Sequence, residues 1–116
     1  DSPFCVAAHS ATSTLWFGDA AKVTATLADL DIAPLEEPLR ATLRMLAMLA
    51  SARSSDAHDI RAVLAAGATA AQVQDALAVA LAFGITARLA NAFDFSVANP
   101  AAMTAGAQHL LKRGYR

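Results

Sequence analysis

The chain of 116 residues has the size of one domain with a single buried core. Hydrophobic residues make up 56% of it and charged residues 16%, which excludes a disordered or fibrous chain and favours close-packed helices. The formal net charge is −1 and the Lys and Arg residues form no run, so we expect neither nucleic acid nor a membrane as a partner.

The first two predicted elements are helices with recognisable ends. Ser2 is suited to cap a helix over residues 3–17, because Pro3 at the first helical position gives up only an N–H that would be unpaired anyway. Gly18 is expected to end this helix, and Asp19 to cap a second one that runs to about residue 29. The sequence Asp-Ile-Ala-Pro at residues 31–34 then predicts a loop.

Two further helices are predicted in the middle of the chain. One begins near Glu36 and ends near Arg53, with acidic residues in its first turn and leucines along one face. Met45 lies on this helix and is interpreted as a core residue. Ser55 is expected to open the next helix, and Gly67 to close it, because glycine is favoured just beyond a helix C-terminus.

The longest predicted helix follows a capping box made of Thr69 and Gln72. Its run at residues 76–85 is apolar on every side, which predicts a helix that is buried all round. This run is about half of the roughly 20 residues that a membrane span needs, so we interpret it as a core helix. Asn99 is expected to cap a last helix that runs to about Arg113.

No strand pattern and no interdomain linker compete with these helices. We therefore expect residues 1–116 to form one all-α domain, a helical bundle of five to six helices. The apolar fraction exceeds the ~45–50% of ordinary soluble domains, which leaves too few polar residues to cover a small globule. Some apolar faces are thus expected to lie between subunits of a homo-oligomer.

The stretch SPFCVAAHS contains the only cysteine of the chain, Cys5, four residues before His9. The unpaired N–H groups and the dipole of a first helical turn favour an anion, and the thiolate is the nucleophilic form of cysteine. Residues four apart share one helix face, so the His9 imidazole is expected within reach of the sulfur. Thr12 and Trp16 are expected to continue this face as a wall. The alternative is an inert, buried cysteine beside a histidine that has no task.

A single cysteine cannot form an internal disulfide, which suits the reducing cytoplasm and excludes the disulfide-stapled secreted class. A metal site would need ligands besides Cys5 and His9, and the other imidazoles, His58 and His109, lie far along the chain on predicted polar faces. We therefore expect no metal ion, no cofactor and a solvated His58.

Three longer stretches occur in order along the chain: PFCVAAHS, LRATLRMLAMLAS and VLAAGATAAQVQDALAVALAFGITARLANAF. Together they resemble the alkylhydroperoxidase D-like branch of the carboxymuconolactone decarboxylase family, from Ser2 to about Phe95. The most specific part is the motif at the helix start, which is a cysteine, two residues, a cysteine, three residues and a histidine. The resemblance implies an all-helical antioxidant fold that assembles into trimers, hexamers or similar rings.

The resemblance also assigns a role to each motif position. Cys5 holds the position of the second, peroxide-attacking cysteine, His9 that of the histidine in the proton relay, and Ser2 that of the first, resolving cysteine, which is expected to be exposed. Because Ser2 has no sulfur, the disulfide of the family cannot close within this motif. The family places a relay glutamate upstream, so we expect the chain to lack an N-terminal helical segment. Glu36 and Glu37 lie on the wrong side of the motif for that role.

The function expected from these residues is that of a thiol-dependent peroxidase with peroxiredoxin-type activity. Cys5 attacks a small-molecule peroxide, becomes a sulfenic acid and is reduced by an external thiol, while His9 assists proton transfer. One alternative is a catalytically degenerate oligomeric binding or scaffold protein of the same fold, which Ser2 and the missing glutamate favour. Another is a cofactor-free decarboxylase-like enzyme that acts on a small organic acid by general acid–base catalysis. The thiol motif favours the peroxidase.

Overall fold

The computed structural model describes residues 2–51 and 56–115, and this part of the chain contains helices and no strand. The helices are α1 (Pro3–Phe17), α2 (Ala20–Ala28), α3 (Glu37–Ala50), α4 (Ala57–Ala65), α5 (Ala70–Ala92) and α6 (Pro100–Arg113). The predicted all-α domain of five to six helices is therefore confirmed.

Local capping sets the limits of the helices. The Ser2 side chain accepts the Cys5 N–H at the start of α1, and Gly18 ends this helix with a φ of 66°, a left-handed conformation that glycine adopts without steric cost. At the start of α5, Thr69 and Gln72 exchange the two hydrogen bonds of a capping box, at 3.2 and 2.8 Å. The other predicted caps that the structure confirms are Asp19 and Asn99.

The structure tests only some of the predicted limits of α3 and α4. The structure describes α3 as far as Ala50, so the end predicted near Arg53 and the start predicted at Ser55 lie outside the described residues. Asp56 caps α4 through a capping box. Gly67 follows α4 with a φ of 103°, as predicted for a glycine beyond a helix end.

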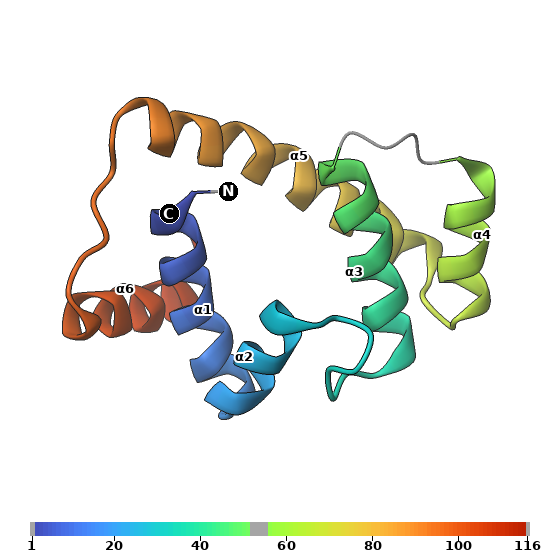
Figure 1. Cartoon of the computed structure of the whole chain (residues 1–116), viewed down its shortest axis with the longest axis horizontal. Helices are drawn as coiled ribbons and strands as arrows, with labels where there is room; N and C mark the ends of the chain where they lie inside the picture. Colours follow the sequence, from blue (N-terminus) through green and yellow to red (C-terminus); the bar gives the residue numbers. More distant parts are fainter. Residues whose placement is uncertain (1, 52–55, 116) are drawn as a thin grey trace.

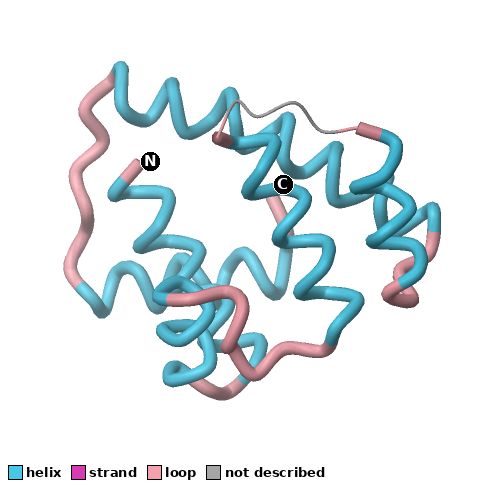
Figure 2. Tube along the Cα trace, turned by 45° about the vertical axis from the view of Figure 1, so that its right-hand side comes forward, coloured by secondary structure: helices cyan, strands magenta, loops and turns pink. Residues whose placement is uncertain are grey.

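The helices form two groups that α5 joins (Figures 1 and 2). In one group α1 packs against α6 and α2, and in the other α3 packs against α4. α5 contacts α1, α3 and α4, and Figure 1 shows it running from behind α3 to the upper left of the molecule, above α1. This arrangement brings side chains of α1, α2, α3 and α5 around one shared cleft.

The loop between α2 and α3 is held in place by two arginines of α3. Arg40 donates hydrogen bonds to the main-chain oxygens of Asp31 and Leu35, and Arg44 pairs with the Asp31 carboxylate at 2.6 Å. Leu35 is buried, and it is also one of the residues that line the cleft. The ion pairs of this loop therefore position one wall of the cleft.

A small buried cluster joins α3, α4 and α5. Met45 and Val63 are almost fully buried at its centre, and Ala68 and Val73 complete it. The prediction that Met45 is a core residue is confirmed. This cluster lies within the second group of helices, so it holds α3 and α4 against the first half of α5.

The prediction that α5 is buried all round is wrong for the single chain. Leu81 is 70% exposed and Ile85 is 55% exposed, although both lie in or at the end of the apolar run. Within the described residues, the neighbours of α5 cover one part of its circumference, and a helix with 3.6 residues per turn presents the remaining side chains elsewhere. The sequence reports that the helix is apolar and does not report what covers it.

By length and composition alone, α5 is long and apolar enough to cross a membrane, with 23 residues and a mean hydropathy of 1.4 in its most apolar window. The prediction that it is too short counted only its uninterrupted apolar run. Core helices of soluble proteins pass the same test, so this property does not assign α5 to a membrane.

Candidate active site

Cys5 lies in the first turn of α1, as predicted. Its N–H donates to the Ser2 side-chain oxygen at 3.5 Å, and Pro3 takes the first helical position. The thiol is half-buried and is not part of a disulfide. Unlike Cys5, Ser2 is only 2% exposed, so the expectation of an exposed first motif position is wrong. The cap explains this difference in part, because it turns the Ser2 hydroxyl towards the helix start.

Cys5 and His9 line the same cleft, which has a volume of about 600 Å³. They lie one turn apart on α1, as their spacing predicts. Within residues 2–51 and 56–115, the structure records no hydrogen bond between the Cys5 sulfur and His9. The cleft thus brings the two side chains to one surface, where a bound molecule can reach both.

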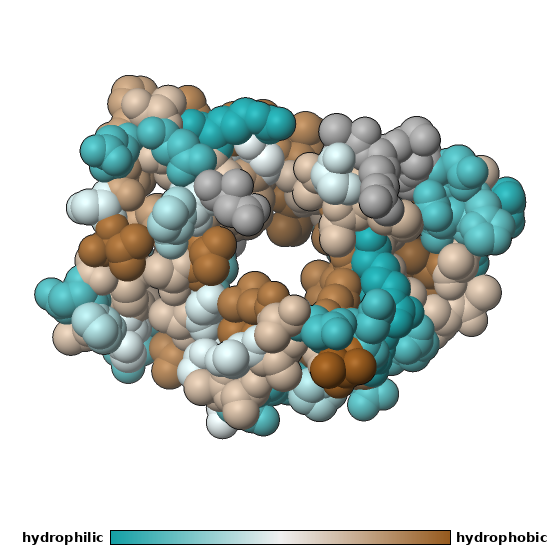
Figure 3. All heavy atoms as spheres, in the orientation of Figure 1, coloured by the Kyte–Doolittle hydropathy of each residue, from teal (hydrophilic) through white to brown (hydrophobic). Residues whose placement is uncertain are grey.

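The walls of the cleft are mostly apolar, and Figure 3 shows hydrophobic residues bordering an opening in the middle of the molecule. α1 supplies Cys5, Val6, His9, Ser10, Ser13 and Phe17, and α2 supplies Lys22, Val23, Thr26 and Leu27. The loop before α3 and α3 itself supply Leu35, Leu39 and Leu43, and α5 supplies Val79 and Phe83. A volume of this size lies within the range of about 300–1,000 Å³ that is typical of small-molecule sites.

The wall predicted from Thr12 and Trp16 is wrong. Trp16 is 73% exposed and is not a lining residue, while the Thr12 hydroxyl donates to the main-chain oxygen of Ala8 at 2.9 Å. The face that carries Cys5 and His9 continues instead through Ser13 and Phe17, each four residues beyond the previous one. Residues three apart and residues four apart both lie on one face of a helix. Only the packing of α1 against α2 and α5 decides which of these residues line the cleft.

His9 contacts two aromatic residues, one through its ring and one through a hydroxyl. Its imidazole meets Phe83 of α5 edge-on, with ring centroids 4.5 Å apart and an angle of 87° between the planes. Its Nε2 atom lies 3.5 Å from the Tyr115 hydroxyl, and the tautomer of His9 decides which of the two atoms donates. Burial lowers the pKa of His9 from its ordinary value of 6.5. The imidazole is therefore neutral at pH 7 and able to accept a proton.

Sequence reasoning missed Tyr115, which lies just beyond α6. Its ring contacts Phe83 at 6.3 Å between centroids, and its hydroxyl faces His9 across 106 positions of the sequence. Partial burial raises the pKa of Tyr115 above 10.0, and the negative charge of a Cys5 thiolate raises it further. Tyr115 is thus protonated at pH 7 beside the pair. No local pattern in the sequence signals a contact made at this distance along the chain.

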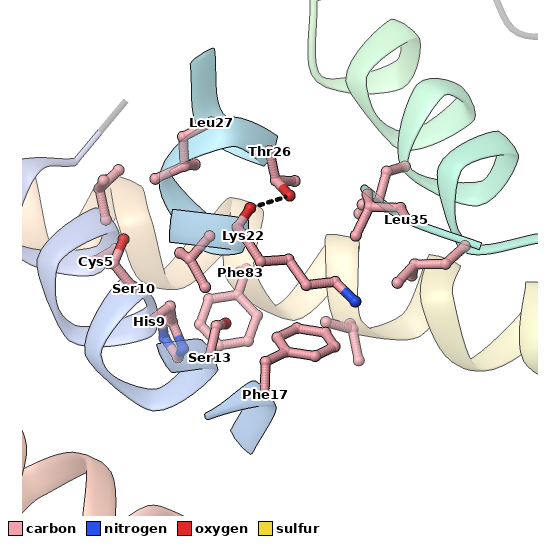
Figure 4. Close-up of a pocket in the computed structure, with 15 residues that line it drawn as sticks. Cys5, His9, Ser10, Ser13, Phe17, Lys22, Thr26, Leu27, Leu35 and Phe83 are labelled. Carbon is pink, nitrogen blue, oxygen red and sulfur yellow. Dashed lines mark hydrogen bonds between the residues drawn. The ribbon is translucent and has the colours of Figure 1, made fainter. Parts of the chain in front are cut away.

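Lys22 is the second residue that sequence reasoning missed. Among the residues that line the cleft, Lys22 is the one lysine or arginine, and no aspartate or glutamate lines it. Its ammonium lies over the Phe17 ring, 4.7 Å from the centroid. Figure 4 shows the side chain reaching from α2 across the cleft towards the side of Leu35, with Cys5 and Ser10 on the other side.

The remaining histidines lie on other helices. His58 is exposed at the start of α4, as predicted, and His109 is exposed on α6. One ligand atom each of Asp56, His58 and Asp59 lies within 4.8 Å of the others. The Asp56 carboxylate accepts the N–H groups of His58 and Asp59, so this group of side chains is explained as the cap of α4.

Comparison with known proteins does not identify a family for this chain. No family model, no curated protein and no solved structure matches it. The resemblance to the alkylhydroperoxidase D-like branch therefore rests on the three sequence stretches given above, and the function is argued below from the cleft.

Proposed function

We propose that the chain is a thiol-dependent peroxidase of the alkylhydroperoxidase D-like kind, with Cys5 as the peroxide-attacking group. The observation that carries this proposal is the position of Cys5 and His9 on one wall of a single apolar cleft. The first-turn position of Cys5 favours an anion, and the cleft offers a bound peroxide access to the sulfur.

The neutral imidazole of His9 supports a role in proton transfer. Its burial keeps it unprotonated at pH 7, so it can take the thiol proton of Cys5 directly or through a water molecule. The thiolate then attacks one peroxide oxygen, an S–O bond forms and the O–O bond breaks. The leaving alkoxide takes the proton back from His9. The products are a Cys5 sulfenic acid and an alcohol, so the sulfur is oxidised by two electrons and the peroxide is reduced by two.

The sulfenic acid of Cys5 needs a reductant from outside the motif, because Ser2 offers no second sulfur. An external thiol condenses with the sulfenic acid, forms a mixed disulfide and releases water. A second external thiol attacks this disulfide, restores the Cys5 thiol and leaves as the oxidised disulfide. The cycle therefore consumes two thiols for each peroxide.

The test is the consumption of cumene hydroperoxide by the purified protein with dithiothreitol as the external thiol. We expect Cys5→Ser to abolish turnover and His9→Gln to lower the rate at pH 7 by about a hundredfold, the lower range for general acid–base assistance. Thr12→Val is the matched control, because Thr12 lies on α1 outside the cleft. The valine side chain has the same shape as that of threonine. Turnover that survives in Cys5→Ser would refute the proposal.

The same experiment addresses the alternative of a binding or scaffold protein without turnover. Ser2 in place of the resolving cysteine favours that alternative. It predicts that the parent protein leaves cumene hydroperoxide unconsumed and that no sulfenic acid is trapped on Cys5 by dimedone. A dimedone adduct on Cys5 without turnover would instead show that the peroxide reacts with Cys5 and that the reduction of the sulfenic acid fails.

A further inference from the structure

The cleft holds a positive charge that the described chain does not neutralise. No ion pair joins Lys22 to an aspartate or glutamate within residues 2–51 and 56–115. The nearest acid before it, Asp19, uses its carboxylate to accept the Lys22 N–H at 3.0 Å. A half-buried ammonium beside apolar walls gains more from an anionic partner than an exposed one does, because less water competes for it.

The polar groups around Lys22 are few. The Thr26 hydroxyl donates to the main-chain oxygen of Lys22 at 2.8 Å, which uses its proton within α2 (Figure 4). The rest of the lining is mostly apolar and includes leucine side chains, Val79 and Phe83. A ligand that satisfies both features has one anionic group for Lys22 and an apolar part for the walls.

We infer that the cleft binds a linear acyl chain with a terminal carboxylate, and that Lys22 pairs with the carboxylate. The inference rests on the proposed function in naming the substrate class as hydroperoxides of such long-chain acids. Lys22 extends towards Leu35 while Cys5 lies on the opposite wall, so a chain anchored at the ammonium runs across the cleft towards the sulfur. The carboxylate and the reacting hydroperoxide then occupy different parts of the same molecule.

Binding of dodecanoate, measured by titration calorimetry, tests the inference without any turnover. We expect the parent protein to bind dodecanoate about tenfold more tightly than dodecanol, because a hydrogen bond to a charged group adds about that factor. The neutral alcohol keeps the chain and removes the charge. Equal affinity for the two compounds, or no binding of dodecanoate, would overturn the inference even if no variant could be made.

Variants assign the preference to Lys22. Lys22→Gln is expected to bind the two compounds equally, and Lys22→Arg to keep the preference for the acid. The matched control is Lys112→Gln, which removes the same charge from α6, outside the cleft. If Lys22→Gln retains the full preference while Lys112→Gln loses it, the carboxylate binds elsewhere and the inference fails.

Two further outcomes separate this inference from the proposed function. If the acid preference is found but no hydroperoxide is reduced, the peroxidase proposal fails and the carboxylate site stands. If hydroperoxides are reduced but dodecanoate does not bind, the peroxidase stands and the carboxylate site is refuted.

Discussion

The imidazole of His9 lies edge-on against the ring of Phe83, 4.5 Å between centroids, and so connects the start of α1 to the middle of α5. Edge-to-face pairs of this kind are favourable beyond the apolar area that they bury. Both side chains line the cleft, and burial lowers the pKa of His9. Phe83 of α5 thus contributes to the surroundings of a residue that we place in proton transfer.

The lowered pKa of His9 predicts how the stability of the protein depends on pH. The unfolded chain binds a proton at His9 with the ordinary pKa of 6.5, while the folded chain binds it only at lower pH. The stabilising contribution of His9 is therefore complete above pH 6.5 and is lost as the pH falls through the pKa of the folded state. We expect the free energy of unfolding, measured with urea, to decrease from pH 8 to about pH 5.5, where carboxylates stay ionised.

The His9→Gln variant is the comparison for this pH profile. The variant keeps His58 and His109, which are exposed. Any decrease in the free energy of unfolding that the variant still shows at low pH is therefore due to groups other than His9. We expect a flatter profile in the variant than in the parent. Identical profiles would contradict the assignment of a lowered pKa to His9, and with it the neutral imidazole on which the proton-transfer step depends.

Local sequence was sufficient to place most helix ends. Capping is decided by residues within one turn, so Ser2, Gly18 and the box of Thr69 and Gln72 could be found without knowledge of the fold. The spacing of Cys5 and His9 was informative for the same reason, since both belong to one helix.

The cleft could not be predicted in the same way, because its lining comes from four helices and a loop, and their packing in space is not a local property of the sequence. Lys22 has no feature in its own segment that places it opposite Leu35. The choice between Trp16 and Phe17 as a lining residue depends on how α1 is turned against α2 and α5, because both residues have large aromatic side chains. The exposure of α5 could not be predicted either. Composition shows that the helix is apolar but does not show which other parts of the molecule cover it.

Met45 is predicted to be the most costly single truncation in the core cluster. It is 1% exposed and packs with Val63 and Val73, so Met45→Ala leaves a cavity among α3, α4 and α5. We expect a loss of about 2–5 kcal/mol in the free energy of unfolding, measured with urea. Ile32→Ala is the control, because Ile32 is 80% exposed and truncation there is expected to change stability by less than about 0.5 kcal/mol. Similar losses in both variants would contradict the position of this core.

The accessible surface predicts self-association. The chain exposes 7978 Å², whereas a monomer of 12.0 kDa typically exposes about 6,000 Å². Apolar side chains of α5, among them Leu81 and Ile85, contribute to the exposed area. We expect light scattering to find an oligomer, and the double variant Leu81→Glu, Ile85→Glu to shift it towards smaller species.

A matched control for this self-association is Ile32→Glu, which adds a charge to an exposed residue in the loop before α3. This variant is expected to keep the mass of the parent. A parent protein that stays a monomer of 12.0 kDa at micromolar concentration contradicts the prediction. So does an oligomer that both variants leave unchanged, because its interface then lies away from the apolar face of α5.

The last prediction concerns Ser2, whose side-chain oxygen lies 3.5 Å from the Cys5 nitrogen at the start of α1. A cysteine at this position places a sulfur one turn from the Cys5 sulfur, within the separation that a disulfide can bridge. We expect Ser2→Cys to react with one equivalent of peroxide by first forming the Cys5 sulfenic acid, which condenses with the new thiol and releases water. Mass spectrometry then shows the loss of two hydrogens in the variant and the gain of one oxygen in the parent.

The burial of Ser2 predicts which sulfur of the disulfide in the Ser2→Cys variant an external dithiol attacks. Because position 2 is 2% exposed while Cys5 is half-buried, an external dithiol is expected to attack the bridge at the Cys5 sulfur. Loss of the serine cap costs the reduced variant about 0.5–2 kcal/mol, which the bridge offsets when it forms. Ser13→Cys is the control, because eight residues along α1 separate the sulfurs by about 12 Å, too far for a disulfide. A folded Ser2→Cys variant that keeps both thiols free after peroxide treatment would show that these two positions do not act as a pair, and the motif interpretation would fail with it.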